Sequence, residues 1–282
     1  MNKGLRKDTE SENDFSHSLS LFAPWREKVT VFTAFFILFS LVNSNLLQAQ
    51  GYLAESENPK IKIKPVVDVQ AFSFDLRDVR LLEGSPFKNA MDKDAAYLLS
   101  IDPNRLLHRF YTNAGLSTKG EVYGGWESEG LSGHTLGHYL SACSMMVAST
   151  GDNRFKVKVD YVVDELDKCQ QARKTGYIGA IPKEDSIFWK LQYGIIKSSG
   201  FDLNGGWSPW YTVHKVMAGL TDAYMYADSQ KALFIVLKMA DWTESILNIL
   251  DDEQLEKMRK CEYGGMNDVL THFMKSPEKK GT

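Results

Sequence analysis

Two histidines in one short segment are the residues best suited to chemistry in this chain. His134 and His138 lie in GWESEGLSGHTLGHYLSACSM, which begins at Gly125. Their four-residue spacing places both rings on one face of a predicted helix. Zinc proteases use the same spacing, but Thr135 stands where their motif needs a glutamate. A structural pair of capping or core histidines is the second alternative, and we favour a role in lining a substrate site.

Aromatic residues stand beside two polar segments. Trp126 precedes the first histidine, and Trp210 and Tyr211 precede His214 in the segment WSPWYTVH. Aromatic rings stack on the apolar faces of sugars, and an indole N–H can also bond a hydroxyl. A neutral imidazole on the next helical turn can donate or accept a hydrogen bond. The alternative is that these aromatic rings only fill the end of a helical core.

A third polar segment, EYGGMND, begins at Glu262. Its two glycines let the backbone approach a ligand closely, while Asn267 has helix capping as its alternative role. Glu127 and Glu129 have the residue type of a glycosidase acid–base pair, but their spacing does not ensure that they face each other across a bond. We therefore assign no catalytic residue and no metal ligand. The predicted substrate-binding residues are Trp126, His134, His138, Trp210, His214, Glu262 and Asn267.

The composition is that of an ordinary globular protein. The 282 residues are 43% hydrophobic and 24% charged, with a net charge of −3, so no basic excess favours binding to phosphate backbones. The three cysteines, Cys143, Cys169 and Cys261, are too far apart for a C-x-x-C metal pair and too few for a disulfide framework. Nucleic acid is therefore not an expected partner, and no cofactor is expected within the chain.

The N-terminal region predicts export to the periplasm or the extracellular space. Residues 29–42 (VTVFTAFFILFSLV) carry no charge and follow Arg26 and Lys28, as in a signal peptide. The run is short for a spanning helix, which needs about 20 apolar residues, although a single membrane anchor is the alternative. The predicted divisions are a polar tail with the signal peptide (1–50), a linker (51–65) and part of one helical domain (66–282).

From residue 85 onward the hydrophobic pattern is helical. The predicted helices are 87–100, 103–113, 132–150, 153–174, 209–227, 229–250 and 264–275. Before them, residues 66–82 alternate apolar and polar positions, which predicts a strand or an extended arm. Short joints after residues 150 and 227 predict helical hairpins. The expected fold is all-α, a toroid of helical hairpins with its ligand site among the Gly- and Trp-rich loops at one end.

Several uncommon sequence words follow one another between residues 66 and 271. They are GWESEGLSGHTLGHYLSA (125–142), DYVVDELDKCQ (160–170), GYIGAIP (176–182), WSPWYTVHKVMAGLTDAY (207–224) and EYGGMNDVL (262–270). In these words the chain resembles the glycoside hydrolase family 127/146 group of β-L-arabinofuranosidase-like proteins. The resemblance implies an (α/α)6 toroid and an exo-acting glycosidase that removes arabinofuranose-type sugars from plant-type glycans.

The resemblance also implies a cysteine nucleophile held on a zinc ion, with a separate glutamate as acid/base. In the family these groups lie C-terminal to the GGMN word, and no residue of this chain is matched to them. We therefore expect the chain to hold about the first half of the toroid, to be nearly inactive alone, and to self-associate through exposed helix faces. Zinc is expected only in the complete family domain. The alternative function is a non-catalytic carbohydrate-binding or structural helical protein.

Overall fold

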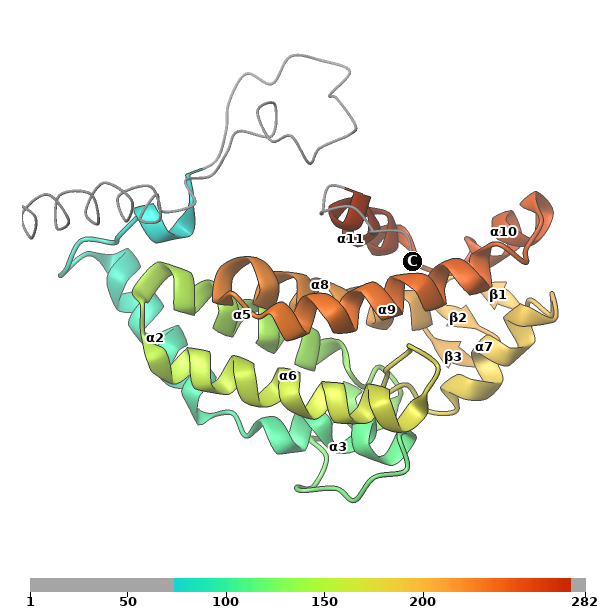
Figure 1. Ribbon diagram of the computed structural model, residues 1–282, viewed down its shortest axis with the longest axis horizontal. Coiled ribbons are helices and arrows are strands. Elements are labelled where there is room, and N and C mark those ends of the chain that lie inside the picture. The colour runs from blue at the N-terminus through green and yellow to red at the C-terminus, as the bar shows by residue number, and fades with distance from the viewer. Residues whose placement is uncertain (1–73, 275–282) are drawn as a thin grey trace, which may run out of the picture. The chain divides into compact units, whose positions relative to one another are not determined.

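The computed structural model describes residues 74–274 of the chain, with side chains as far as Thr271. These residues are mostly helical with little strand (Figure 1), which confirms the predicted all-α fold class. Within this part of the chain, no helix is both long enough and apolar enough to cross a membrane. The predicted signal peptide and linker lie outside the described residues.

Of the two expectations for residues 66–82, a strand or an extended arm, the described part from residue 74 onward fits the arm. Residues 74–82 contain no strand; Leu76–Asp78 is instead a 3-10 helix, η2, capped by the Asp75 side chain. Arg77 donates hydrogen bonds to the backbone carbonyls of Met225 (2.9 Å) and Tyr226 (3.2 Å). This segment is an arm that holds a helix end, and its alternating pattern meets no neighbouring strand.

The long helices form where the hydrophobic pattern predicts them, each boundary within about one turn. Their bounds are α2 (Pro86–Ser100), α3 (Pro103–Asn113), α5 (His134–Thr150), α6 (Asn153–Arg173), α8 (Pro209–Ala227), α9 (Gln230–Leu247) and α11 (Gly264–Met274). Side-chain caps explain several of the starts. Ser85, Asp102 and Asp152 each accept a hydrogen bond from the first turn of the helix that follows.

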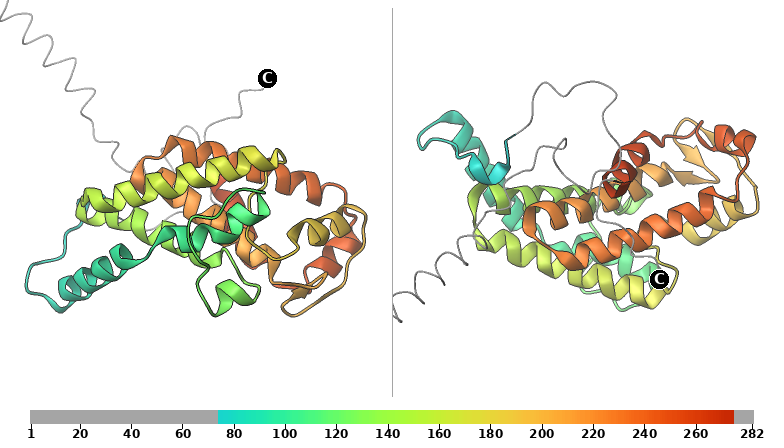
Figure 2. Two further views of the ribbon diagram at one scale, coloured as in Figure 1. Left: turned by 90° about the horizontal axis from the view of Figure 1, so that it is seen from below. Right: turned by 45° about the horizontal axis from the view of Figure 1, so that its top comes forward.

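Two helical hairpins form the body of this region, as the short joints predict. α5 contacts α6, and α8 contacts α9. Gly151 and Asp228 adopt the left-handed backbone conformation that ends α5 and α8. α6 also contacts α3 and α9, and Figure 2 shows α6 and α9 side by side. One apolar core therefore runs through both hairpins.

The tightest contact between helices joins the two hairpins through glycines. A Cβ on Gly137 of α5 would overlap the Lys215 carbonyl of α8, and a Cβ on Gly219 would lie 2.6 Å from the Gly137 oxygen. Neither position has room for a side chain, so the backbones of α5 and α8 meet directly. The two helices run parallel there, and their first turns lie at the same end.

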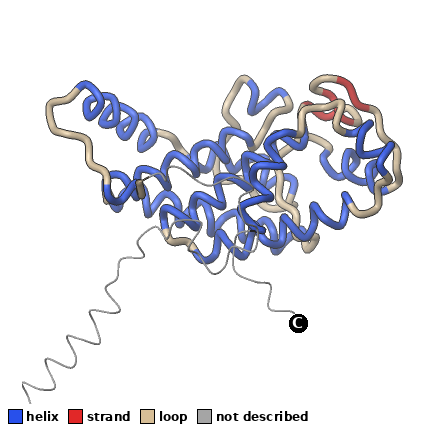
Figure 3. Tube along the Cα trace, turned by 90° about the horizontal axis from the view of Figure 1, so that it is seen from above, coloured by secondary structure: helices blue, strands red, loops and turns tan. Residues whose placement is uncertain are grey.

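The structure adds short elements that the hydrophobic pattern did not predict. They are the helices α4 (Trp126–Glu129), α7 (Glu184–Gln192) and α10 (Asp252–Met258), and the strands β1 (Ser198–Ser199), β2 (Asp202–Leu203) and β3 (Gly206–Trp207). The strands form a small antiparallel sheet, red in Figure 3. Tertiary contacts hold these elements: the Asn204 amide donates to the carbonyls of Ile187 (3.3 Å) and Ile195 (3.0 Å).

Candidate functional site

Polar rings gather where α5 and α8 begin side by side. The ring centroid of His134 lies 6.0 Å from that of His138 and 6.0 Å from that of Tyr211. Nε2 of His138 lies 3.4 Å from the Tyr211 hydroxyl. The backbone contact at Gly137 explains this arrangement, because it brings the first turns of both helices together.

Two tryptophans extend this group of rings. The ring centroid of Trp126 lies 6.0 Å from that of His134 and 6.2 Å from that of Trp207. Trp126 is 60% exposed and Trp207 is 36% exposed, so both indoles are open to a ligand. We use the name ring cluster for Trp126, His134, His138, Trp207, Tyr211 and His214.

His214, like His134, is a buried member of the ring cluster. Its ring centroid lies 6.4 Å from that of Tyr211, the residue is 8% exposed, and its Nδ1 has no hydrogen-bond partner among the described residues. Burial, and secondly the ammonium of Lys215, lower the pKa of His214 to about 4. The ring is therefore neutral at pH 7 and can donate or accept a hydrogen bond.

The segment at Glu262 meets the ring cluster from α11. Gly265 lies against the His214 ring, where a Cβ would overlap the imidazole. Burial, and secondly the charge of Glu262, raise the pKa of Tyr211. The Oε2 atom of Glu262 is buried and has no hydrogen-bond partner within residues 74–274. Two unpaired polar atoms, one on His214 and one on Glu262, thus border the cluster, and such atoms are uncommon in folded proteins.

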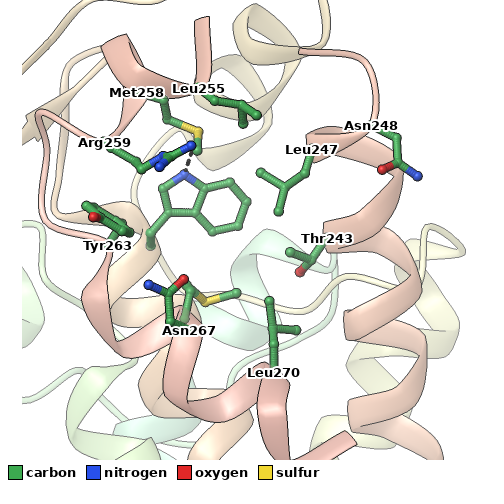
Figure 4. A pocket seen from close by; sticks show the side chains of 11 residues that line it. Thr243, Leu247, Asn248, Leu255, Met258, Arg259, Tyr263, Asn267 and Leu270 are labelled. Carbon is green, nitrogen blue, oxygen red and sulfur yellow. Dashed lines mark hydrogen bonds between the residues drawn. The ribbon is translucent and has the colours of Figure 1, made fainter. Parts of the chain in front are cut away.

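Trp210 and Asn267 lie on the same helices as Tyr211 and Gly265, but they line a separate pocket. Trp210 is 2% exposed, and its indole N–H donates to the Met258 sulfur at 3.2 Å. Both residues line an apolar pocket of about 410 Å³ between α9, α10 and α11, and Figure 4 shows Leu255 and Leu270 on its walls. The structure therefore separates these two predicted residues from the ring cluster, and their contact with a sugar stays a prediction.

The comparison with protein families agrees with this architecture. A family model described as beta-L-arabinofuranosidase, GH127 catalytic domain, matches residues 78–277, which include the whole ring cluster. This chain belongs to the GH127 family. No curated protein matches it. Membership of GH127 makes the domain a glycosidase domain at the level of the family, with carbohydrate as the implied substrate.

The GH127 resemblance implies zinc held by cysteine, and the described residues do not fit such a site. Among residues 74–274, no group of three or more His, Cys, Asp or Glu side chains is placed to hold a metal ion. Burial raises the thiol pKa to about 11 for Cys143 and Cys261 and to about 12 for Cys169. These thiols are protonated at neutral pH and are poor nucleophiles. We therefore derive no catalytic step through zinc.

The helical register of α8 decides that Tyr211, and not its neighbour Trp210, belongs to the ring cluster. Trp210 and Tyr211 are neighbours in sequence, yet Trp210 is buried among Phe188 and Trp242 while Tyr211 lies beside His134. Residue type alone favours both rings equally. The left-handed backbone at the residue before α8, which no periodicity predicts, helps to set this register.

Proposed function

We propose that this chain is an exported glycoside hydrolase that acts on terminal arabinofuranose-type sugars of plant-type glycans, with the ring cluster as its sugar-binding surface. Membership of GH127 supports the glycosidase class. The main support for the sugar-binding site is that the rings of Trp126, His134 and Tyr211 lie close together where neighbouring helices begin.

The ring cluster offers both kinds of contact that proteins make with sugars. The exposed indoles of Trp126 and Trp207 suit stacking on the C–H bonds of a furanose ring. The neutral imidazole of His214 and the carboxylate of Glu262 suit hydroxyl groups, which both donate and accept hydrogen bonds.

In this proposal the reacting groups lie outside residues 74–274. Glycoside hydrolysis with retention needs an acid/base and a nucleophile that flank the bond. The resemblance assigns both roles to groups C-terminal to the GGMN word, and the described cysteines are buried and protonated. Residues 74–274 then bind and orient the terminal sugar, and the complete domain performs the double displacement.

A binding titration tests the ring cluster. Methyl β-L-arabinofuranoside is titrated into the protein at pH 7, and calorimetry and tryptophan fluorescence report binding. Trp126→Ala should weaken the affinity about five- to tenfold, since one stacked aromatic ring contributes about 1 kcal/mol. Trp189→Ala is the matched control, because Trp189 is similarly exposed (53%) but lies on α7 outside the cluster. Equal losses in the two variants, or no binding by the wild type, would overturn the proposed site.

An activity assay tests whether the reacting groups lie within the 282-residue chain. The 282-residue chain is incubated with a chromogenic arabinofuranoside in the presence of zinc and a thiol reductant. We expect binding with little turnover, because residues 74–274 hold no ionised thiol. Robust turnover by this chain would show that its reacting groups lie within it, contrary to the proposal.

Export is proposed on residues 29–42, which have the character of a signal-peptide core. Expression in a bacterial host followed by N-terminal sequencing should find cleavage close to Ala49. An uncleaved protein in the membrane fraction would instead favour the single anchor.

A further inference from the structure

Glu127 is a buried acid on the short helix α4. Its carboxylate lies at the start of the next helix, α5, which has no capping side chain of its own. Glu127 is 6% exposed, whereas Glu129 on the same short helix is exposed. α5 begins after Gly133, which has no side chain to accept a hydrogen bond. Glu127 supplies that acceptor: its Oε2 accepts from the Gly133 N–H at 3.0 Å, and its Oε1 accepts from the Thr135 N–H at 3.1 Å. The positive end of α5 stabilises the buried carboxylate in return.

The same carboxylate contacts a ring of the proposed sugar site. Nδ1 of His134 lies 3.2 Å from Oε1 of Glu127 and 2.5 Å from the carbonyl oxygen of Leu131. A carboxylate and a carbonyl can only accept hydrogen bonds, so Nδ1 must carry a proton. Nε2 has only a long contact of 3.5 Å with the Thr135 hydroxyl and is the nitrogen that faces a ligand. The ring lies 6.0 Å from His138 and 6.0 Å from Tyr211 by centroids.

The backbone of Glu127 is hydrogen-bonded by residues of α3 and of the loop between α4 and α5. Its backbone carbonyl accepts hydrogen bonds from Nε of Arg109 (3.3 Å) and from the Ser132 hydroxyl. Arg109 also donates to the carbonyl of Ser128 at 3.0 Å. A continuous set of contacts thus runs from α3 through α4 to the first turn of α5.

The surroundings of Glu127 favour its charged form. Burial acts to raise the pKa of this carboxyl, but the hydrogen bonds from His134, Thr135 and Gly133 outweigh it, and the net pKa is lowered. Glu127 is therefore ionised at neutral pH. An ionised carboxylate accepts through both oxygens at once. The contacts of Oε2 with Gly133 and of Oε1 with Thr135 and His134 require this.

We propose that Glu127 is a positioning residue for sugar binding. Together with the Leu131 carbonyl it fixes the His134 ring with Nδ1 protonated, so that Nε2 is presented to the ring cluster. The role of the sugar rests on the proposed function, whereas the contact between Glu127 and His134 does not depend on it. In the neutral ring Nε2 accepts a hydrogen bond from a sugar hydroxyl. Glu127 thereby selects a ligand that donates at this point, without touching the ligand itself.

Nitrogen NMR of the histidine rings tests the contact without any ligand. In the wild type we expect His134 in a single tautomer, with Nδ1 protonated and a lone pair on Nε2. Glu127→Gln has one oxygen where the site uses two, so the His134 ring should move and its resonances should shift from their wild-type positions. Glu127→Asp is a second variant, for use if Glu127→Gln does not fold. It keeps the charge, but its shorter side chain cannot reach both the start of α5 and the His134 ring, so it should change the His134 resonances as well. Glu129→Gln is the control and should leave the spectrum unchanged.

A titration with methyl β-L-arabinofuranoside then tests the consequence for binding. Glu127→Gln should weaken the affinity at least fivefold, and Glu129→Gln should leave it unchanged. Unaltered His134 resonances in folded Glu127 variants, or unaltered affinity in Glu127→Gln, would overturn the positioning role. No binding by the wild type would overturn the proposed function and the sugar role with it, while the NMR result still decides whether Glu127 fixes the ring.

Discussion

The burial of His214 makes the stability of the fold depend on pH. Its ring is 8% exposed with an unpaired Nδ1, and its pKa falls from 6.5 to about 4. Between these two pH values the unfolded chain binds more protons than the folded chain. Acidification through this range therefore lowers the free energy of unfolding.

Replacement of His214 should flatten part of the pH dependence of stability. The wild type should lose about 1–2 kcal/mol of unfolding free energy between pH 7 and pH 4.5 through this residue. His214→Gln does not titrate and should lose that much less over the same interval. Urea denaturation at both pH values measures the difference, and parallel pH profiles for the two proteins would contradict it.

Gly265 and Gly264 form a matched pair for testing the contact between α11 and His214. A methyl group on Gly265 would overlap the imidazole, whereas one on Gly264 meets nothing within 4 Å. We expect Gly265→Ala to displace the ring and to reduce the free energy of unfolding by about 1–3 kcal/mol. Gly264→Ala should change it by a few tenths of a kcal/mol at most. Thermal melts that fail to separate the two variants would place α11 away from His214.

At the residue scale, the site was predicted from residue types. The helical register, which decides whether a side chain faces the cluster or the core, could not be predicted. Trp126, His134 and His214 come together because each stands at or near the start of a helix, which the sequence shows. The burial of Trp210 could not be predicted, because it depends on the backbone turn before α8. The carboxylate of Glu127 accepts from the N–H of Gly133, six positions further along the chain, and no periodic pattern predicts such a contact.

At the scale of elements, the helices of the site are predictable and their pairing is not. Periodicity predicts the bounds of α5 and α8, helped by Gly151 after α5 and Pro209 in the first turn of α8. Their parallel contact depends on Gly137 and Gly219, which propensity alone treats as weak points in a helix. The short helices α4, α7 and α10 lie below the length at which periodicity can be measured, and tertiary contacts decide them.

A side chain at Gly137 should separate α5 from α8. Gly137→Ala should lower the free energy of unfolding by about 3 kcal/mol or more, because the new methyl group meets the backbone of α8, which cannot rotate away. Met145→Ala is the control on the same helix, since Met145 is 39% exposed and should cost well under that amount. Chemical denaturation measures both variants. A stabilised Gly137→Ala protein, as helix propensity alone would produce, would contradict the close contact.

At the scale of the whole molecule, apolar side chains stay exposed outside the ring cluster. Trp189 and Tyr193 are 53% and 67% exposed, with ring centroids 4.7 Å apart, and Phe201 is 69% exposed. Exposed apolar groups of this kind favour association between molecules. The expectation of self-association therefore has a physical basis in the described residues, and it remains a prediction.

Light scattering coupled to size exclusion tests that expectation. We expect the wild type to elute as a concentration-dependent mixture of monomer and larger species. The double variant Tyr193→Gln with Phe201→Gln removes two exposed rings and should shift the mixture toward monomer. A wild type that stays monomeric over a hundredfold range of concentration would show that these side chains drive no association.

The contact between Gly137 and α8 has a consequence for how the site can change. The spacing between the two ring-bearing turns is set by main-chain atoms, so it does not depend on which rings those turns carry. Exchanging His138 or Tyr211 for other polar or aromatic residues should therefore alter the preferred ligand while the frame keeps its dimensions. A selection experiment restricted to these two positions can use that independence to retune recognition without rebuilding the fold.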